Sequence, residues 1–530
     1  MMQRNAWKLA VLGGLLITGC GISPRIAAVP EPETIQEVPK TMPVIPEPDP
    51  AAVTTPDGFH AEVVMKGLIY PTSVEFDDAQ SMYIAESGYA YGDLNAPARV
   101  FRVLPDGNIE VAVHSLMGPV NDLLWYEDRL YISHRGKISA LDRDGELRDL
   151  VTGLPSFGDH HNNQMTVGPD GKIYFGQGTA TNSGVVGVDN FLLLWLPLYP
   201  DIHDRPAHDI ALTGKRFLTM NPFVMAGGDI LSGEKSAMAK TGAFSPFGKI
   251  SGGVVQGVTK ANGTILRMNP DGSDLEVYAW GLRNPFGVMW GLDKRLYASE
   301  NGFDERGSRP VANDTDDLYV IKQGAWYGWP DFAGGVPVTD KRFKPEGRPQ
   351  PEFLMKEHPP VEKPFMTFQP HSAVTKIGFD SNGHFGGAGY LFMALYGSEA
   401  PITGKQPHHA DYMAHRIVRI HLQDKQIETF FANAIAGKTI LHAGGGTLEV
   451  VGNPAGLQRP VDVVFSPDGK AMYVTDFGVM DILSTKVPLP KTFPGTGVIW
   501  RIVPEGVMID TPPANLSIIP AKVSRDYNTE

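Results

Sequence analysis

The stretch "MTVGPDGKIYFGQG", from Met165 to Gly178, predicts a strand, a tight turn and a second strand. Pro-Asp-Gly is typical of a turn, and Lys-Ile-Tyr-Phe is typical of a strand. The pattern recurs along the chain, which indicates a repeated hairpin unit. The other copies are "SVEFDDAQSMYIAES" from Ser73, "DLLWYEDRLYISH" from Asp122, "GVMWGLDKRLYASENG" from Gly287, "IGFDSNGHFGGAGYLFMALYG" from Ile377 and "VDVVFSPDGKAMYVTDFG" from Val461.

More strand patterns lie between these copies, such as "GTILRMNPDGSDLEVYAW" from Gly263. Four short strands per unit, repeated around a circle, are typical of a β-propeller. The copies therefore predict an all-β fold, a six-bladed β-propeller over residues 57–510. A long insertion, Ala180 to Gly263, precedes the fourth unit, and a seventh blade hidden within it is the alternative.

The bulk properties restrict the function. The chain has 530 residues, a net charge of −13 and a single cysteine. The absence of a basic stripe argues against nucleic acid as a partner. With one cysteine the chain folds without internal disulfides, and without Cys-x-x-Cys-His it attaches no c-type haem.

The first residues predict export. Positive charges precede the apolar run Leu9 to Ile17, which is too short to span a bilayer and is typical of a signal peptide, here residues 1–19. "ITGC" resembles the lipobox of bacterial lipoproteins, which implies lipidation of Cys20 and an anchor in the cell envelope. We expect the periplasmic side of a membrane, the outer rather than the inner one. An ordinary signal peptide or an uncleaved anchor is the alternative.

Both ends of the chain have the composition of non-core segments. Prolines alternate with glutamates from Ser23 to Pro56, a composition that favours extended chain over a packed core. We therefore expect residues 20–56 to form a tether after the lipidated cysteine. Residues 511–530 are expected to form a C-terminal tail.

Polar residues gather just ahead of the repeated hairpins, where propeller loops open onto the central channel. They are Asp159, His160 and His161, Arg283 and Asn284, His371, and Arg459 and Asp462. If the units circle one axis, these side chains converge on a pocket suited to an anionic ligand. A histidine beside a carboxylate is a candidate general base. The structural alternative is that they cap turns and tie blades together.

A family resemblance becomes visible in two stretches. These are "GLRNPFGVMWGLDKRLYASENGFDERGSRPVANDTDDLYVIKQGAWYGWPDFAGG" from Gly281 and "DHHNNQMTVGPDGKIYFG" from Asp159. They resemble the PQQ-dependent glucose/sorbosone dehydrogenase family. The resemblance implies a six-bladed propeller that holds pyrroloquinoline quinone (PQQ) and Ca²⁺. It also implies oxidation of a sugar or related alcohol, with electrons passed to an external acceptor.

The resemblance also assigns catalytic roles. The family's base lies eight residues before the glycine of "GPDG", which is His160 rather than His161. His160 would take the hydroxyl proton, and Asp159 would orient it. Arg283 would stabilise negative charge that develops on the quinone.

The same resemblance assigns the binding residues. Asn284 and Arg459 correspond to cofactor-binding positions, and His371 could help them. The family's calcium site uses backbone carbonyls after the fourth inner hairpin, which corresponds to Asn301 and Gly302 in "SENGFDERGS". Ca²⁺ accepts main-chain oxygen ligands of this kind.

The sequence also departs from the family. The family has a glutamine in an early blade where this chain has Val120 or Asn121. The family's lysine near the end of the blade-five strand has no counterpart here, and its second arginine before blade six aligns with Val461. Several contacts to the cofactor carboxylates are therefore missing. This keeps open a non-catalytic envelope propeller that binds a glycan or a protein. A metal-dependent lactonase is disfavoured, because it needs inward carboxylates where this chain offers arginines.

Two other motifs carry weaker signals. "HDRPAHD" from His203 has residue types that bind metals but fits a polar loop better. The aromatic residues of "GAWYGWPDF" could stack on a sugar, although packing between blades is the more common use.

Overall fold

The computed structural model describes residues 44–90, 96–225, 238–399, 414–443, 446–481, 491–509 and 512–518. The predicted signal peptide, Cys20, most of the tether and most of the C-terminal tail lie outside these residues. Within them, no helix is long and apolar enough to cross a membrane.

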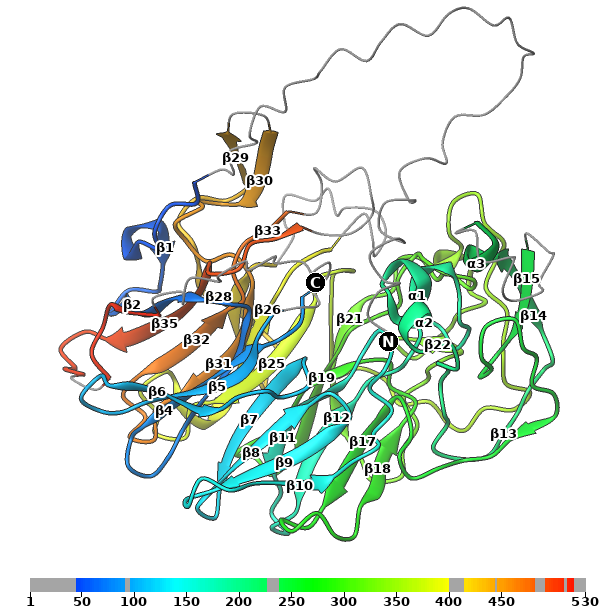
Figure 1. The fold of residues 1–530 in the computed structure, drawn as a ribbon, viewed down its shortest axis with the longest axis horizontal. Coiled ribbons are helices and arrows are strands. Elements are labelled where there is room, and N and C mark those ends of the chain that lie inside the picture. The colour runs from blue at the N-terminus through cyan, green and yellow to red at the C-terminus, as the bar shows by residue number, and fades with distance from the viewer. Residues whose placement is uncertain are drawn as a thin grey trace, which may run out of the picture.

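Six sheets of four or five strands form a six-bladed β-propeller in the described chain, as predicted (Figure 1). Blade one is β3 (Pro71–Phe76), β4 (Met82–Ser87), β5 (Ala98–Val103) and β6 (Ile109–Val113). Blade two is β7 (Val120–Tyr126), β8 (Arg129–His134), β9 (Lys137–Asp142) and β10 (Leu147–Val151). Blade three is β11 (Asn162–Val167), β12 (Ile173–Gln177), β17 (Thr264–Met268) and β18 (Glu276–Trp280). Blade four is β19 (Pro285–Trp290), β20 (Leu296–Glu300), β21 (Asp316–Ile321) and β24 (Met366–Phe368).

Blades five and six each gain a fifth strand. Blade five is β25 (Val374–Phe379), β26 (Tyr390–Leu395), β27 (Arg416–His421) and β28 (Ile427–Asn433), extended by β1 (Val53–Thr54). Blade six is β31 (Pro460–Phe465), β32 (Met472–Asp476), β35 (Gly497–Pro504) and β2 (Phe59–Leu68), extended by β36 (Leu516–Ser517).

The apolar core lies between neighbouring blades. The innermost strands contact one another in turn, and β31 returns to β3 to close the ring. Between blades two and three, for example, Tyr131 and Ile138 pack against Phe175 and Leu266, all nearly inaccessible to solvent. Burial of such side chains between facing sheets is the main force that holds a propeller together.

The two ends of the domain meet in blade six. The early strand β2 is antiparallel to the late strand β35, and β36 runs parallel to β2, so blue and red ribbons lie together in Figure 1. The domain also begins earlier than we predicted. Val53 is buried, and β1 and the 3₁₀ turn Pro50–Ala52 belong to the propeller, so the tether ends before Pro50 rather than at Pro56. The C-terminal boundary at 511 is likewise too early.

The long insertion lies inside blade three, between β12 and β17, rather than between complete blades. In its described residues it forms no seventh blade, and it adds short helices to a fold that is otherwise β. Its elements are α1 (Val188–Leu192), α2 (Trp195–Leu198), β13 (Ile210–Ala211), β14 (Arg216–Met220), α3 (Pro222–Met225), β15 (Met238–Gly242) and β16 (Val254–Val255). The remaining small elements are β22 (Phe332–Ala333), β23 (Val336–Pro337), β29 (Lys438–Ala443), β30 (Gly446–Val451), β33 (Met480–Asp481), β34 (Lys491–Thr492), and the 3₁₀ turns Lys341–Phe343 and Gly387–Gly389.

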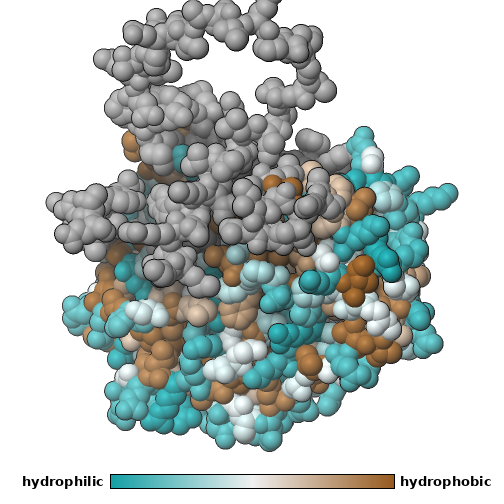
Figure 2. Space-filling model, turned by 45° about the vertical axis from the view of Figure 1, so that its right-hand side comes forward, coloured by the Kyte–Doolittle hydropathy of each residue, from teal (hydrophilic) through white to brown (hydrophobic). Residues whose placement is uncertain are grey.

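The insertion exposes several large apolar side chains among its polar residues. Its exposed large side chains include Leu218, Met220, Met238 and Val254. Figure 2 shows apolar patches among hydrophilic residues on the face that this view brings forward.

The aromatic residues of the motif "GAWYGWPDF" are buried. Trp326, Tyr327 and Trp329 are each at most 6% exposed, so the interpretation of this motif as packing is the right one.

Each innermost strand has a β-bulge in its first residues. A bulge changes the direction of the side chains beside it, and bulges are common next to active sites. One residue at each bulge lines a cavity at one end of the channel: Thr72, Asn121, Asn163, Phe286, Thr375 and Val461. The residues that follow them are Ser73, Asp122, Gln164, Gly287, Lys376 and Asp462, which we call the axial ring.

The axial ring contains a buried ion triad. Lys376 Nζ lies 2.7 Å from Asp122 Oδ1 and 3.1 Å from Asp462 Oδ2, and Ser73 Oγ donates to Asp462 at 3.1 Å. Burial alone would lower the pKa of Lys376, but the two carboxylates raise it above its ordinary value. Burial raises the pKa of Asp122 to about 6 in spite of the lysine. The triad thus joins blades two, five and six at the axis.

Candidate active site

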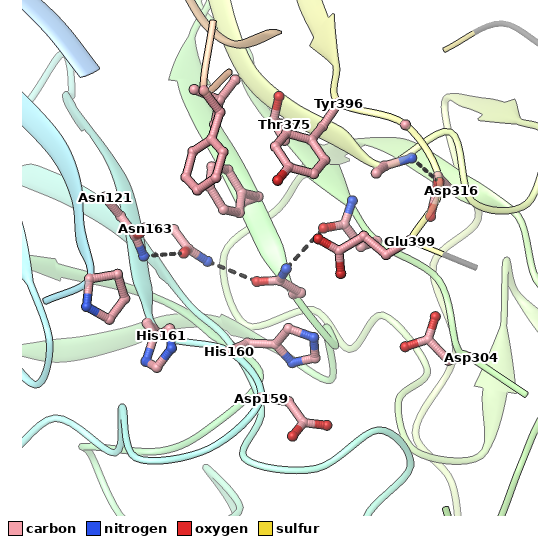
Figure 3. A pocket seen from close by; sticks show the side chains of 18 of the residues that line it. Asn121, Asp159, His160, His161, Asn163, Asp304, Asp316, Thr375, Tyr396 and Glu399 are labelled. Atoms are coloured by element: carbon pink, nitrogen blue, oxygen red, sulfur yellow. Dashed lines mark hydrogen bonds between the residues drawn. The ribbon is translucent and has the colours of Figure 1, made fainter. Parts of the chain in front are cut away.

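A cavity of about 200 Å³ opens at the bulged ends of the inner strands. It brings together seven of the eight predicted catalytic, cofactor and metal residues, and Figure 3 labels two of them, Asp159 and His160, among the side chains that line it. These seven are Asp159, His160, Arg283, Asn284, Asn301, Gly302 and His371. They converge because two kinds of loop meet at the same mouth of the central channel. One is the loop before each innermost strand, and the other is the loop after the strand that pairs with it.

The hydrogen bonds of His160 fix its tautomer. Its Nδ1 lies 3.0 Å from the carbonyl oxygen of Thr179 and 3.1 Å from Thr179 Oγ1. That hydroxyl already donates its hydrogen to the carbonyl of Thr181 at 2.7 Å. Both partners of Nδ1 are therefore acceptors, so Nδ1 carries the ring proton and Nε2 keeps a lone pair.

The electrostatic surroundings keep His160 neutral. Burial, followed by the positive charges of Arg283 and Arg306, lowers the pKa of His160 well below its ordinary value. A neutral imidazole with a lone pair on Nε2 is the form that can accept a proton. The neighbouring His161 is also neutral, because burial lowers its pKa to about 3, but its Nδ1 bonds the carbonyl of Ser156 at 3.0 Å.

Asp159 does not orient His160, which corrects the prediction. Asp159 Oδ1 accepts from Asn190 Nδ2 and its Oδ2 accepts from Arg306 Nη1, each at 2.8 Å. Thr179, which follows the second strand of the same hairpin, supplies the acceptors for the histidine instead. Adjacent residues in an extended segment point to opposite sides, so the aspartate and the histidine are directed at different partners.

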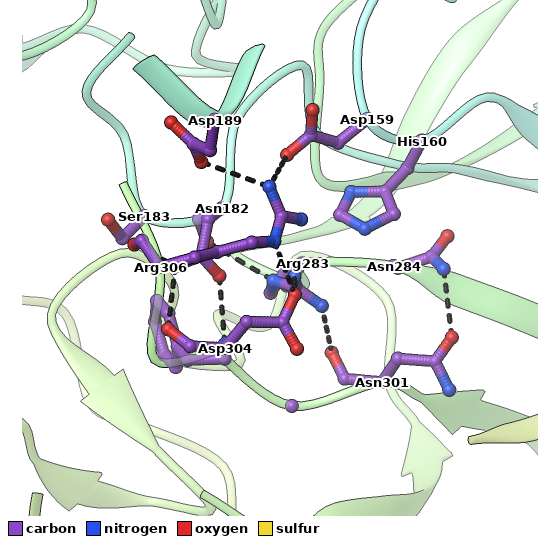
Figure 4. A network of polar contacts seen from close by, with 12 residues as sticks. Asp159, His160, Asn182, Ser183, Asp189, Arg283, Asn284, Asn301, Asp304 and Arg306 are labelled. Carbon is purple, nitrogen blue, oxygen red and sulfur yellow. Dashed lines mark hydrogen bonds and ion pairs between the residues drawn. The ribbon is translucent and has the colours of Figure 1, made fainter. Parts of the chain in front are cut away.

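Arg283 and Arg306 form one charged network around Asp304 (Figure 4). Arg283 Nη2 lies 2.6 Å from Asp304 Oδ2, and Arg306 Nε lies 3.1 Å from the same oxygen. His371 Nδ1 lies 3.8 Å from the other oxygen, Oδ1. Burial would raise the pKa of Asp304, but the positive charges of Arg283 and Arg306 lower it below its ordinary value. The aspartate is thus ionised and holds both arginines at the cavity wall.

Four asparagines form a continuous chain of amide hydrogen bonds along the cavity. Asn121 donates to Asn163 at 3.2 Å, Asn163 to Asn284 at 3.0 Å, and Asn284 to Asn301 at 2.9 Å. The chain crosses blades two, three and four. Asn284 therefore holds its neighbours in place as well as facing the cavity.

Arg459 does not line the cavity. Its guanidinium donates to the carbonyls of Gly397 at 3.3 Å and Ser398 at 3.2 Å, and it lies over the ring of Tyr396. The side chain is buried behind the wall that these residues form. The predicted contact with a cofactor carboxylate would require it to turn away from both carbonyls.

The predicted metal-binding turn lies beside two carboxylates. Gly302 N donates to Asp316 Oδ1 at 2.8 Å, and an added Cβ on this glycine would lie 2.3 Å from the carbonyl of Thr315. Asp304 and Asp316 line the same part of the cavity as the Asn301–Gly302 turn. In the described residues, no group of three or more His, Cys, Asp or Glu side chains is arranged to hold a metal ion, as a lactonase would need. Any Ca²⁺ here would depend on backbone oxygens.

Several functional residues were missed from the sequence: Thr179, Asp304, Arg306, Tyr396 and Glu399. Burial raises the pKa of Glu399 to about 7, although Arg459 opposes the shift. A signal was available for two of them, since "ENGFDERG" places Asp304 and Arg306 two residues apart in a loop at the channel mouth. Their partners come from other blades, which the sequence does not reveal.

The space beside His160 predicts an effect of substituting Gly178. A Cβ at this position would lie 2.3 Å from His160 Cβ and 2.9 Å from Asn284 Oδ1. We expect Gly178→Ala to lower the free energy of unfolding by about 1–3 kcal/mol through overpacking, as measured by urea denaturation. Gly252→Ala, where nothing lies within 4 Å, is the control. Equal stability of the two variants would contradict this packing.

The motif "HDRPAHD" serves as a structural loop. Asp204 is buried and accepts from Ala180 N and Thr181 Oγ1, while His203 is half-buried and its Nδ1 lies 2.7 Å from the carbonyl oxygen of Asp201. Burial raises the pKa of Asp204 to about 7, with the hydrogen bond from Thr181 opposing the shift.

This raised pKa predicts a pH dependence of stability. A carboxyl whose folded pKa exceeds its unfolded value retains a proton on folding, so it costs stability as the pH rises between the two values. We expect Asp204→Asn to remove that loss. Its free energy of unfolding relative to the wild type should rise by about 1–2 kcal/mol between pH 5 and pH 7 in urea denaturation. A difference independent of pH would show that Asp204 is ionised in the folded protein.

The fold and the site define a class: a six-bladed β-propeller with a neutral histidine and an arginine at the mouth of its channel. Residues 241–395 match the sequence profile of the family described as Glucose / Sorbosone dehydrogenase, a segment that contains Arg283, Asn284, Asn301 and His371. The chain is thus a six-bladed β-propeller that is similar to this family over residues 241–395.

One protein is similar to this chain in sequence, and another is similar in fold. Quinoprotein glucose dehydrogenase B of Acinetobacter calcoaceticus is 27% identical over 188 residues, which cover 35% of this chain and 29% of the relative. The match thus spans less than a third of that protein's length. The holo form of the pyranose dehydrogenase PQQ domain from Coprinopsis cinerea has a TM-score of 0.51 and 15% identity, covering 86% of this chain and 98% of that chain. This second likeness concerns the fold alone.

Proposed function

We propose that this chain is a quinoprotein oxidoreductase that oxidises a sugar or related alcohol with PQQ and passes the electrons to an external acceptor. The observation that carries the proposal is the contact of His160 Nδ1 with the carbonyl and hydroxyl oxygens of Thr179, which assigns the ring proton to Nδ1 and the lone pair to Nε2. The match of residues 241–395 to the Glucose / Sorbosone dehydrogenase family and the similarity of 188 residues to a quinoprotein glucose dehydrogenase support it.

The residues present fit the reactive end of a planar quinone. Phe286, Tyr396 and Phe477 line the cavity and offer aromatic surface, and Arg283 offers a fixed positive charge. Arg283 and Asn284 would hold the quinone, with Ca²⁺ at the backbone oxygens of Asn301 and Gly302. When bound, PQQ supplies a two-electron acceptor.

The chain's own residues provide for the proton of the reaction. Oxidation of a CH–OH group removes a proton from oxygen and a hydride from carbon. His160 accepts that proton at Nε2, while the Nδ1–H bond to Thr179 keeps the ring in position. Arg283 is held by Asp304 and by the carbonyl of Asn182 at 3.2 Å, so its charge is in place before the substrate arrives.

The test is a titration of the full-length protein with PQQ, with and without Ca²⁺, followed by the quinone absorbance. A panel of aldoses with a dye acceptor follows. Calcium-dependent binding together with dye reduction by any sugar is the expected result. Absence of binding at a PQQ concentration of about 1 mM, where even a weak site would be half filled, would overturn the proposal.

A second function has one specific observation in its favour. Arg459 is turned toward backbone carbonyls and Val461 lines the cavity, so among the described residues this side of the cavity offers no cation to a cofactor carboxylate. This arrangement favours a non-catalytic propeller that binds a glycan or a protein partner. Glycan binding in the absence of PQQ, with no dye reduction, would support that function.

We also propose that the protein is lipid-anchored through Cys20 on the periplasmic side of the cell envelope. The proposal depends on the lipobox-like "ITGC" sequence. Cys20→Ser is expected to move the protein from the membrane fraction to the soluble fraction. Unchanged membrane association of this variant would contradict the anchor.

A further inference from the structure

The first part of the insertion forms one wall of the cavity. Leu193, directly after α1, lines the cavity and is 7% exposed. The preceding residue, Leu192, is 39% exposed. The two leucines thus face opposite ways, one toward the cavity and one toward solvent.

A clamp holds this wall against the residue beside His160. Arg306 Nη1 lies 2.8 Å from Asp159 Oδ2 and 2.9 Å from Asp189 Oδ2 of α1. Asn190 of α1 also donates to Asp159 Oδ1 at 2.8 Å. Figure 4 shows Arg306 between Asp159 and Asp189, with His160 next to them. Blade three, blade four and the insertion are therefore joined at one buried cluster of charges.

The other end of this wall is held by aromatic packing. Trp195 of α2 lies with its ring centroid 5.2 Å from that of His161 and 5.4 Å from that of Tyr89. The guanidinium of Arg135 lies 5.1 Å from the Trp195 ring centroid, where it gains a cation–π contact. Charge fixes α1 and aromatic contacts fix α2, so the wall is rigid on the side of both histidines.

We propose that α1 and Leu193 form a fixed wall that controls access to His160, and that Arg306 holds this wall in place. The substrate preference of the wall rests on the proposed function, in which the substrate is a sugar. For such substrates the wall favours a single sugar ring over longer saccharides. A second ring attached on the Leu193 side would collide with the wall.

The wall can be tested without any assay of activity. Cys20 is the single cysteine of the chain, so Cys20→Ser provides a background for Leu193→Cys and for the matched control Leu192→Cys. Both are labelled with a small methanethiosulfonate and with a bulky polyethylene-glycol maleimide. We expect the bulky reagent to label Leu193→Cys about 100-fold more slowly than Leu192→Cys, because labelling requires the wall to open. Equal rates with the bulky reagent would contradict the proposal that α1 and Leu193 form a fixed wall.

The clamp has its own test in the same background. Asp189→Ala removes one partner of Arg306, so we expect it to increase the bulky labelling of Leu193→Cys about tenfold. The small reagent, which can enter through the cavity, should label at an unchanged rate. An unchanged rate with the bulky reagent would show that Arg306 does not hold the wall.

Substrate preference is tested by Leu193→Ala against Leu192→Ala. We expect Leu193→Ala alone to raise the kcat/KM ratio of a disaccharide to its monosaccharide by about tenfold. An unchanged ratio would overturn the size limit. If the labelling results hold but the wild type oxidises no sugar, the proposed function fails while the wall stands. If sugars are oxidised but the labelling rates are equal, the wall fails while the function stands.

Discussion

His160→Ala is expected to lower kcat for sugar oxidation by about 10³-fold, the typical contribution of a positioned general base. The variant removes the Nε2 lone pair that accepts the hydroxyl proton, while Arg283 and Asn284 stay in place through Asp304 and the asparagine chain. Dye-coupled turnover measures the loss. PQQ titration of the same variant should show binding close to that of the wild type.

The control for this prediction is His203→Ala, which removes a half-buried histidine of the insertion that lies outside the cavity lining. It should leave turnover and stability within error of the wild type. Turnover by His160→Ala within tenfold of the wild type would remove His160 from the mechanism. Loss of both turnover and PQQ binding would instead show that the imidazole is needed to assemble the site.

Lys376→Met is expected to reduce the free energy of unfolding by about 3–5 kcal/mol, because it leaves Asp122 and Asp462 buried without their counter-charge. Lys376 is fully buried and lies within 3.1 Å of both carboxylates. Burial of uncompensated charge is costly, and this site lies where three blades meet. Urea denaturation followed by far-ultraviolet circular dichroism measures the change.

Two further variants separate charge from packing. Lys322→Met removes a lysine that pairs with Glu362 at 2.7 Å on the surface, and we expect it to cost at most about 1 kcal/mol. Adding Asp122→Asn and Asp462→Asn to Lys376→Met should recover part of the lost stability. A loss for Lys376→Met no larger than that for Lys322→Met would show that water reaches the axial ring.

The repeat pattern was sufficient to predict six blades. Each hairpin carries its own turn chemistry and its own alternation of apolar residues, and these are local properties of the sequence. The strand pairing that closes the ring was not predicted. β2 pairs with β35 across more than 400 residues of chain, and nothing in the sequence of either strand identifies its partner.

The positions of His160, Arg283, Asn284 and His371 at the cavity follow from the repeat, because equivalent loops of a propeller face the same mouth. Their partners do not follow from it. Thr179 rather than Asp159 binds the His160 ring, and Arg306 joins Asp159 to Asp189 of the insertion. The repeat and the family resemblance both predicted Arg459 at the same mouth, but its guanidinium binds the carbonyls of Gly397 and Ser398 instead.

The sequence by itself thus determined the number of blades and which loops carry the polar residues, since both depend on patterns within about 20 residues of chain. Only the tertiary structure decided how these residues pair. Bulges at the start of each inner strand set two successive side chains toward the axis, and the insertion inside blade three adds Asp189 and Leu193 to the cavity. Such pairings join distant segments, and their geometry exists only once the ring is closed.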